Sequence, residues 1–175
     1  MTGRRAIGYL LVALAALSGP NLYERATFAP LPADAHADRI VVKKALRRLT
    51  LYRAAAPLKT YRIALGAEPV GPKQFEGDQR TPEGAFTVDS RLPDSRFHMA
   101  LHVSYPGAKE AAEAAAAGRD PGSAIMIHGL RNGLGLAGPV HIARDWTAGC
   151  IAVTNREIEE LWRVVPDGTP IEIEP

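Results

Sequence analysis

Short apolar segments, separated at close intervals by glycine and proline, constrain the fold of this chain more than any other feature. Runs of about four to eight apolar or alternating residues with turn residues at both ends are typical of β-strands. Eight such segments occur, at 39–42, 46–53, 58–65, 85–88, 98–103, 124–127, 150–153 and 169–173. We therefore predict a mainly β fold, with a β-hairpin formed within 39–65.

Two segments have helical patterns instead. Residues 108–117 are an Ala/Glu run that strongly favours a helix, and Gly118 follows where a helix commonly stops. Thr154 and Glu157 have the spacing of a capping box and begin a second helix with apolar residues at 158, 161, 162 and 165. The 175 residues fit one domain. We predict a β-rich single domain, a β-sandwich or barrel with two short helices.

The connections between these elements include two long ones. Residues 70–81 are polar and rich in turn residues, and 130–138 are rich in glycine. Both are predicted to be loops, and long loops in compact domains are often functional.

The first 19 residues differ from the rest of the chain. Arg4 and Arg5 precede a 12-residue apolar run at 6–17, and Ser18-Gly19-Pro20 follows. This layout is typical of a signal peptide, and the run is shorter than the roughly 20 residues that span a bilayer. We predict a signal peptide or uncleaved N-terminal anchor at 1–19, a linker at 20–38 and the folded domain at 39–175. The protein is expected to be periplasmic or exported, with membrane contact only through an uncleaved anchor.

The net charge of +2 comes from 21 Lys and Arg against 19 Asp and Glu. Because Arg4 and Arg5 account for this excess, the remainder of the chain is neutral. Binding to phosphate backbones needs a surplus of basic side chains on one face. Nucleic acid is therefore not expected as a partner.

The chain has one cysteine, Cys150, which excludes an internal disulfide and a multi-thiolate metal site. It is either a small buried hydrophobe or a reactive thiol. Gly149 precedes it and both permits unusual backbone geometry and leaves room for a substrate. A nucleophilic cysteine needs a base to form its thiolate, and histidine is the usual one.

Four histidines are candidates for that base: His98, His102, His128 and His141. His128 ends an apolar strand beside a glycine, as expected of a side chain directed into a cleft. His98 and His102 would share one face of a strand and could bind a metal with His128. No Asp or Glu nearby completes a ligand pattern, so we predict neither a metal nor another cofactor.

Four ordered segments resemble the catalytic domain of the L,D-transpeptidases, the YkuD family. They are Thr81-Pro82-Glu83-Gly84-Ala85-Phe86, Ile127-His128-Gly129, Asp145 to Val153 with Asn155, and Asp167 to Ile171. The resemblance covers nearly all of the folded part. It implies an enzyme that acts on peptidoglycan stem peptides, with Cys150 as nucleophile and His128 as general base and acid.

The resemblance also implies roles for other residues around the cysteine. The backbone N–H groups of Gly149 and Cys150 are expected to form an oxyanion hole, and the Gly129 carbonyl is expected to orient His128. Thr147 and Asn155 are interpreted as supports for the cysteine loop, or as a turn hydroxyl and a helix N-cap. The predicted substrate-binding residues are Gly129, Thr147, Trp146, Arg144 and Tyr105, although Trp146 and Tyr105 could instead only pack.

Two positions depart from the family pattern. The histidine before Gly-Cys is replaced by Ala148, and the arginine that often follows two residues after the cysteine is replaced by Ala152. The substrate carboxylate thus lacks one expected partner, for which Arg80, Arg131 or Arg144 could substitute. His141 could fill part of the space left at Ala148.

Two other functions stay open at this point. The thioester could react with water, which would make the protein an L,D-carboxypeptidase or amidase acting on wall-linked peptides. The chain could also be a non-catalytic cell-wall-binding module with a silent thiol.

Overall fold

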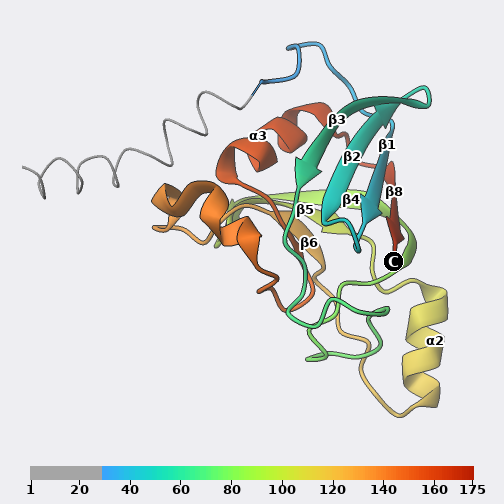
Figure 1. Cartoon of the computed structure of the whole chain (residues 1–175). Helices are drawn as coiled ribbons and strands as arrows, with labels where there is room; N and C mark the ends of the chain where they lie inside the picture. Colours follow the sequence, from blue (N-terminus) through green and yellow to red (C-terminus); the bar gives the residue numbers. More distant parts are fainter. Residues whose placement is uncertain (1–28) are drawn as a thin grey trace, which may run out of the picture.

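A computed structural model describes residues 29–175 of the chain (Figure 1). Its elements are β1 (Arg39–Lys43), β2 (Arg48–Arg53), β3 (Ala56–Arg62), β4 (Gly84–Ser95), β5 (His98–Val103), α2 (Ala108–Ala116), β6 (Met126–His128), the 3-10 helix η1 (Gly135–Ala143), β7 (Ile151–Ala152), α3 (Asn155–Val164) and β8 (Thr169–Glu174). The predicted β-rich fold with two short α-helices is confirmed for this range. The predicted signal peptide or anchor at 1–19 lies outside the described residues. Within 29–175, no helix has both the length and the apolar character needed to cross a membrane.

The eight strands form one mixed sheet in the order β3-β2-β1-β8-β4-β5-β6-β7. The β1–β8 and β6–β7 pairs are parallel, and the other pairs are antiparallel. The predicted hairpin is β2–β3, which turns at Ala54 and Ala55.

The two ends of this sheet meet. Ala64, just after β3, exchanges two hydrogen bonds with Ala152 of β7, at N···O distances of 2.9 and 2.8 Å. Gly66 forms a further bridge with Thr147. The sheet therefore curls around its own core, and β7 lies where it closes.

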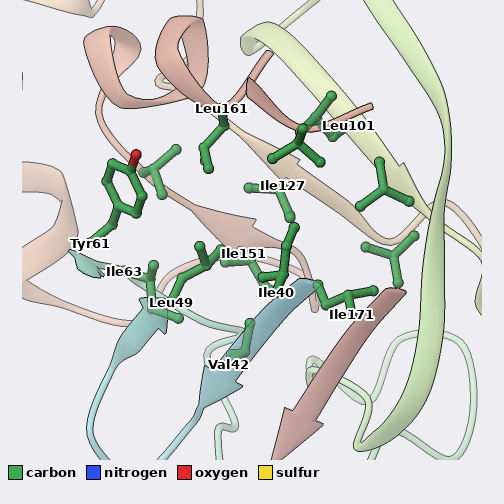
Figure 2. Close-up of a cluster of buried hydrophobic side chains, with 14 of the residues drawn as sticks. Ile40, Val42, Leu49, Tyr61, Ile63, Leu101, Ile127, Ile151, Leu161 and Ile171 are labelled. Carbon is green, nitrogen blue, oxygen red and sulfur yellow. The ribbon is translucent and has the colours of Figure 1, made fainter. Parts of the chain in front are cut away.

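Apolar side chains from nearly every strand fill the inside of the curled sheet. Figure 2 shows this cluster, in which the labelled residues are Ile40, Val42, Leu49, Tyr61, Ile63, Leu101, Ile127, Ile151, Leu161 and Ile171. Helix α3 packs against β5 and β6 and buries Ile158 and Leu161, and Val165 just after its end is buried as well, as the spacing predicts. Ile127 and Ile151 anchor β6 and β7 to the core from one face, which leaves the other face of these strands for the site.

The helix boundaries follow the signals in the sequence. Thr154 caps α3, because its hydroxyl accepts the Glu157 N–H while the Glu157 carboxylate accepts the Thr154 N–H. Gly118 follows α2 with a φ of +64°, a conformation that suits glycine. The predicted loop at 130–138 is partly wrong, since the 3-10 helix η1 begins at Gly135 and continues to Ala143.

The described part of the predicted linker contacts the domain. Ala37 is fully buried, and its N–H donates to the Val164 carbonyl. Leu31 N–H donates to the buried carboxylate of Glu160, and Arg163 binds the carbonyls of residues 31–33. Residues 31–38 therefore lie against α3.

Candidate active site

The register of β6 and β7 places Cys150 and His128 on one face of the sheet. Ile127 pairs with Ile151 and His128 pairs with Ala152, so Cys150 lies across from Met126. Side chains alternate along a strand, so those of Cys150 and His128 lie on the face opposite to Ile127 and Ile151. His128, the last residue of β6, and Cys150, the residue just before β7, are 22 positions apart in the sequence and thus lie near each other where the sheet closes.

His128 is buried, with 3% of its surface exposed, and its ring is oriented by the backbone. Nδ1 lies 2.7 Å from the Gly129 carbonyl oxygen, which can only accept, so Nδ1 carries the proton and Nε2 carries the lone pair. The orienting contact that the sequence predicts is therefore present. Burial lowers the pKa of His128 to about 4, the Gly129 carbonyl opposes this, and His141 adds to it. At neutral pH the ring is uncharged and can accept a proton.

The Cys150 thiol is half-buried and lies 3.6 Å from the Ala124 carbonyl oxygen. Burial raises the pKa of Cys150, while a hydrogen bond from the Met126 N–H and the charge of Lys73 act in the opposite direction. With a raised thiol pKa and a lowered imidazole pKa, the resting pair is a neutral thiol and a neutral imidazole. Such a pair needs a base that takes the proton as the sulfur attacks.

The loop before Cys150 is held by Thr147. The buried Thr147 hydroxyl donates to the Cys150 carbonyl at 2.7 Å and accepts the Gly149 N–H at 3.1 Å. These hydrogen bonds support the interpretation of Thr147 as a support for the loop, while its substrate-binding role stays a prediction. The Gly149 N–H is already paired, which contradicts the expectation that it is a free oxyanion donor.

Gly149 is required here for space. Its φ is +131°, and a Cβ would come within 2.6 Å of the Arg80 carbonyl oxygen. The segment 79–81 packs directly on the cysteine loop, and no other residue type would allow this approach.

Asn155 supports the histidine side of the site. Its side-chain Oδ1 accepts the Leu130 N–H at 2.7 Å, so α3 is tied to the chain just after His128 and Gly129. It is not the N-cap that one interpretation of the sequence suggested, because Thr154 has that position. Gly129 is buried, and its carbonyl orients His128; its contact with substrate stays a prediction.

An apolar groove of about 560 Å³ lies beside His128. Phe97 and Trp146 form one wall and contact the imidazole, with ring centroids 4.5 and 5.8 Å from it. The remaining lining residues are Leu130, Arg131, Leu134, Val140, His141, Ala143 and Arg144. Trp146, 37% exposed, therefore lines the groove as well as packing on His128.

Other predicted contacts lie elsewhere. Tyr105 is 2% exposed and packs edge-on against Phe86, which favours the interpretation that it only packs. The Arg80 guanidinium is near Gly71, whereas Arg131 and Arg144 line the groove. Both ring nitrogens of His141 face carbonyl oxygens, of Gly138 and Val153, so His141 ties η1 to the chain after β7.

The three histidines of the metal alternative have separate partners. His98 pairs with Glu159, His102 pairs with Asp89, and His128 contacts the Gly129 carbonyl. Within residues 29–175, no group of three or more His, Cys, Asp or Glu side chains could hold a metal ion.

The curled sheet with a cysteine and a histidine beside each other at its closure matches a known class of protein. The family model of the L,D-transpeptidase catalytic domain, YkuD, matches residues 37–173, and the chain belongs to this family. It is 32% identical over 111 residues to YafK of Escherichia coli strain K12, covering 62% of this chain and 37% of YafK. It is 30% identical over 142 residues to YkuD of Bacillus licheniformis, covering 78% and 66% of the two chains. Both relatives carry the provisional name of L,D-transpeptidase.

Solved structures share the fold. The helical cell shape determining protein Pgp2 of Campylobacter jejuni superposes with a TM-score of 0.58 at 24% identity, over 81% of this chain and 48% of that one. An L,D-transpeptidase of Mycobacterium smegmatis superposes with a TM-score of 0.52 at 18% identity, over 79% and 59%. The chain thus spans little more than a third of YafK and about half of Pgp2.

Proposed function

We propose that this protein is a peptidoglycan L,D-transpeptidase with Cys150 as its nucleophile. The observation that carries the proposal is the β6–β7 register, which puts Cys150 and His128 on one face of adjacent strands. The oriented ring of His128, with its lone pair on Nε2, and the adjoining groove support it further.

In the proposed reaction, the Cys150 sulfur attacks the carbonyl carbon of the third residue of a donor stem peptide. His128 Nε2 takes the thiol proton and delivers it to the amine of the departing D-Ala, and a thioester remains. The amine of an acceptor stem then attacks the thioester, His128 takes its excess proton, and Cys150 leaves as the thiol. No net proton, water or cofactor is consumed.

The negative oxygen of each tetrahedral intermediate needs hydrogen-bond donors. We propose the Cys150 N–H for this role, since the Gly149 N–H is paired with Thr147. A single such donor contributes about 3–4 kcal/mol in enzymes of comparable chemistry. The groove would hold stem peptide against Trp146, with Arg144 and Arg131 near enough to its rim to attract a carboxylate.

Hydrolysis is the second candidate. Ala148, at the position of a family histidine, is exposed beside the cysteine loop and leaves that side of the thioester without an imidazole. Water could then compete with the acceptor amine, which would make the protein an L,D-carboxypeptidase or amidase.

The test is incubation of the purified protein with disaccharide-tetrapeptide and analysis of the products by mass. A cross-linked dimer with release of D-Ala supports the transpeptidase, whereas tripeptide alone supports the hydrolase. Cys150→Ala and His128→Ala should abolish either product. If the Cys150→Ala variant retains the native function of the protein, the chain is a wall-binding module and both enzyme proposals fail.

A second assay separates thiol chemistry from turnover. A carbapenem should acylate Cys150 in the intact protein and add its mass, and the adduct should disappear in Cys150→Ala and form much more slowly in His128→Ala. Chelators should have no effect on this reaction.

The proposed substrate also indicates the compartment in which the protein works. Members of the family act on the cell wall, so we propose that this protein works outside the cytoplasm, consistent with the signal-like segment at 1–19. Because Pgp2 is described as determining helical cell shape, an effect on cell shape is a reasonable phenotype to examine.

A further inference from the structure

A buried ion pair lies in the long loop between β3 and β4. Lys73 and Asp78 have only 4% of their side-chain surfaces exposed, and Lys73 Nζ lies 2.9 Å from Asp78 Oδ1 and 2.9 Å from the Phe75 carbonyl oxygen. Asp78 also accepts the N–H groups of Gln74, Phe75 and Arg80. Removing both charges from water costs several kcal/mol per ion, which the close contact and these hydrogen bonds offset.

The loop that holds this pair packs against two segments near Cys150, one that contains Gly149 and one that contains Gly122. On one side, the Arg80 carbonyl oxygen lies within 2.6 Å of the position that a Cβ on Gly149 would take. On the other side, Lys73 Cε lies 3.5 Å from the corresponding position on Gly122, two residues before the Ala124 carbonyl that the thiol contacts. The Lys73 side chain therefore packs against the segment that leads to the Ala124 carbonyl.

The charges on the elements packed around Cys150 do not duplicate that of Lys73. His128 on β6 is neutral, and the Arg80 guanidinium lies by Gly71. The Asp120 carboxylate accepts the Gly122 N–H, and Asp78 is directed to the backbone of its own loop. Among these groups, Lys73 is the one whose charge lowers the pKa of Cys150, against the effect of burial.

We propose that Lys73 is a positioning residue of the reaction, whose buried ammonium, held by Asp78, stabilises the Cys150 thiolate that forms as His128 takes the proton. The inference rests on the proposed role of Cys150 as nucleophile. It would also give the thiolate a stabilising cation in a chain that lacks the family arginine at Ala152.

The test measures the thiol directly. Cys150 is the only cysteine of the chain, so alkylation of the folded protein by iodoacetamide reports this residue alone. The rate is followed from pH 6 to 11 by mass, and folding of each variant is checked by circular dichroism. The alkylation rate should rise with pH, and the midpoint of this rise is the pKa of the thiol. Lys73→Met should move that midpoint upward by about one pH unit and slow alkylation about tenfold at neutral pH. Lys73→Arg should stay close to wild type.

Asp78→Asn is the matched control, because it breaks the ion pair but keeps the cation, and it should not raise the midpoint. Loosening of the loop would expose the thiol and lower the midpoint, which is opposite to the change expected for Lys73→Met. If Lys73→Met does not fold, the double variant Lys73→Met/Asp78→Asn replaces it, with a smaller upward shift expected, because the carboxylate of Asp78, which disfavours the thiolate, is removed together with the ammonium. An unchanged or lowered midpoint in the variant that lacks Lys73 would overturn the inference.

The outcome separates this inference from the proposed function. A Lys73-dependent midpoint in a protein that forms no thioester with tetrapeptide would leave the inference standing and remove the proposed activity. If the protein forms the thioester but the alkylation midpoint is the same with and without Lys73, the proposed activity stands and this inference fails.

Discussion

His128 and Cys150 start from uncharged forms, and this has a direct kinetic consequence. Burial lowers the pKa of His128 to about 4, and burial raises the pKa of Cys150 above its ordinary value. The productive form, neutral imidazole with protonated thiol, therefore exists over a wide range of pH. A preformed thiolate–imidazolium pair would be expected only if the order of the two pKa values were reversed.

We predict that kcat/KM for a tetrapeptide donor rises through an acid limb near pH 4 and then stays level through neutral pH, because burial raises the pKa of Cys150. For His128 the sign follows from the lowered pKa, since the imidazole is protonated and lost as a base only when the pH falls through that value. Stopped assays across pH 3 to 10, with enzyme stability controlled at each pH, give the profile. An acid limb near 6.5, the value of an unperturbed histidine, would show that His128 is not the buried neutral base described here.

Thr147 is expected to act on the geometry of the cysteine loop. Thr147→Val keeps the shape of the side chain but removes both hydrogen bonds of its hydroxyl, to the Cys150 carbonyl and from the Gly149 N–H. We expect a loss of about 1–3 kcal/mol in the free energy of unfolding and a fall in kcat/KM of about tenfold or more. Urea denaturation and the donor assay measure the two effects.

Thr147→Ser is the control, because it retains the hydroxyl, and it should remain close to wild type in both measurements. A Thr147→Val protein with full activity would mean that the loop keeps its geometry without these bonds.

At the scale of elements, α3 serves the site as well as the core. Its apolar face packs on β5 and β6, and its first residue, Asn155, fixes the chain that leaves β6. Gly129 must be a glycine for this contact, because a Cβ there would come within 2.6 Å of Asn155 Oδ1. The position of the His128 ring therefore depends on how α3 begins.

Asn155→Ala should leave the buried Leu130 N–H without its acceptor. Such an unpaired donor costs about 1–3 kcal/mol, and we expect the free energy of unfolding to fall by that amount. Activity should fall as well, since the Gly129 carbonyl that orients His128 lies next to the released segment. Asn155→Asp keeps an acceptor oxygen and should preserve most of the stability, as measured by urea denaturation. Equal losses in the two variants would mean that the hydrogen bond is not what Asn155 contributes.

The sequence predicts the individual strands and helices, but it does not predict how they pair. Local signals such as alternation in the strands and the Thr154–Glu157 capping box identify all eight strands and both α-helices within 29–175. Pairing across the sheet has no local signal, so the sequence could not place Cys150 opposite Met126 or tie Asn155 to Leu130. Tyr105 illustrates the same limit, because a tyrosine after a strand has the same sequence pattern whether it faces substrate or Phe86.

Lys73 is not recognisable from the sequence as a residue of the site, for a related reason. A single lysine in a polar loop is usually solvated, and its burial depends on Asp78 and on the packing of the loop against the cysteine segment. The one hint in the sequence is Asp78, five positions after Lys73, and an acidic residue at such a spacing is too common to indicate a buried ion pair.

For the molecule as a whole, closure of the sheet decides what the site can contain. Ala64 and Ala152 exchange hydrogen bonds across the closure and, with Ile142, form a separate buried apolar cluster. Both alanines are fully buried, so neighbouring strands and η1 leave no volume for a larger side chain at position 152. The closed sheet therefore has no room for the family arginine at position 152. Position 148 is exposed and has no such restriction.

This difference predicts opposite results for restoring the two family residues. Ala152→Arg should overfill the closure and bury a charge without a partner, at a cost of about 4 kcal/mol or more in the free energy of unfolding. Ala148→His should change that free energy by no more than about 0.5 kcal/mol, because its side chain extends into solvent. Urea denaturation of the two variants beside wild type measures both values. A stable Ala152→Arg protein would mean that the strands can separate at Ala64, and that the closed sheet is not a requirement of the fold.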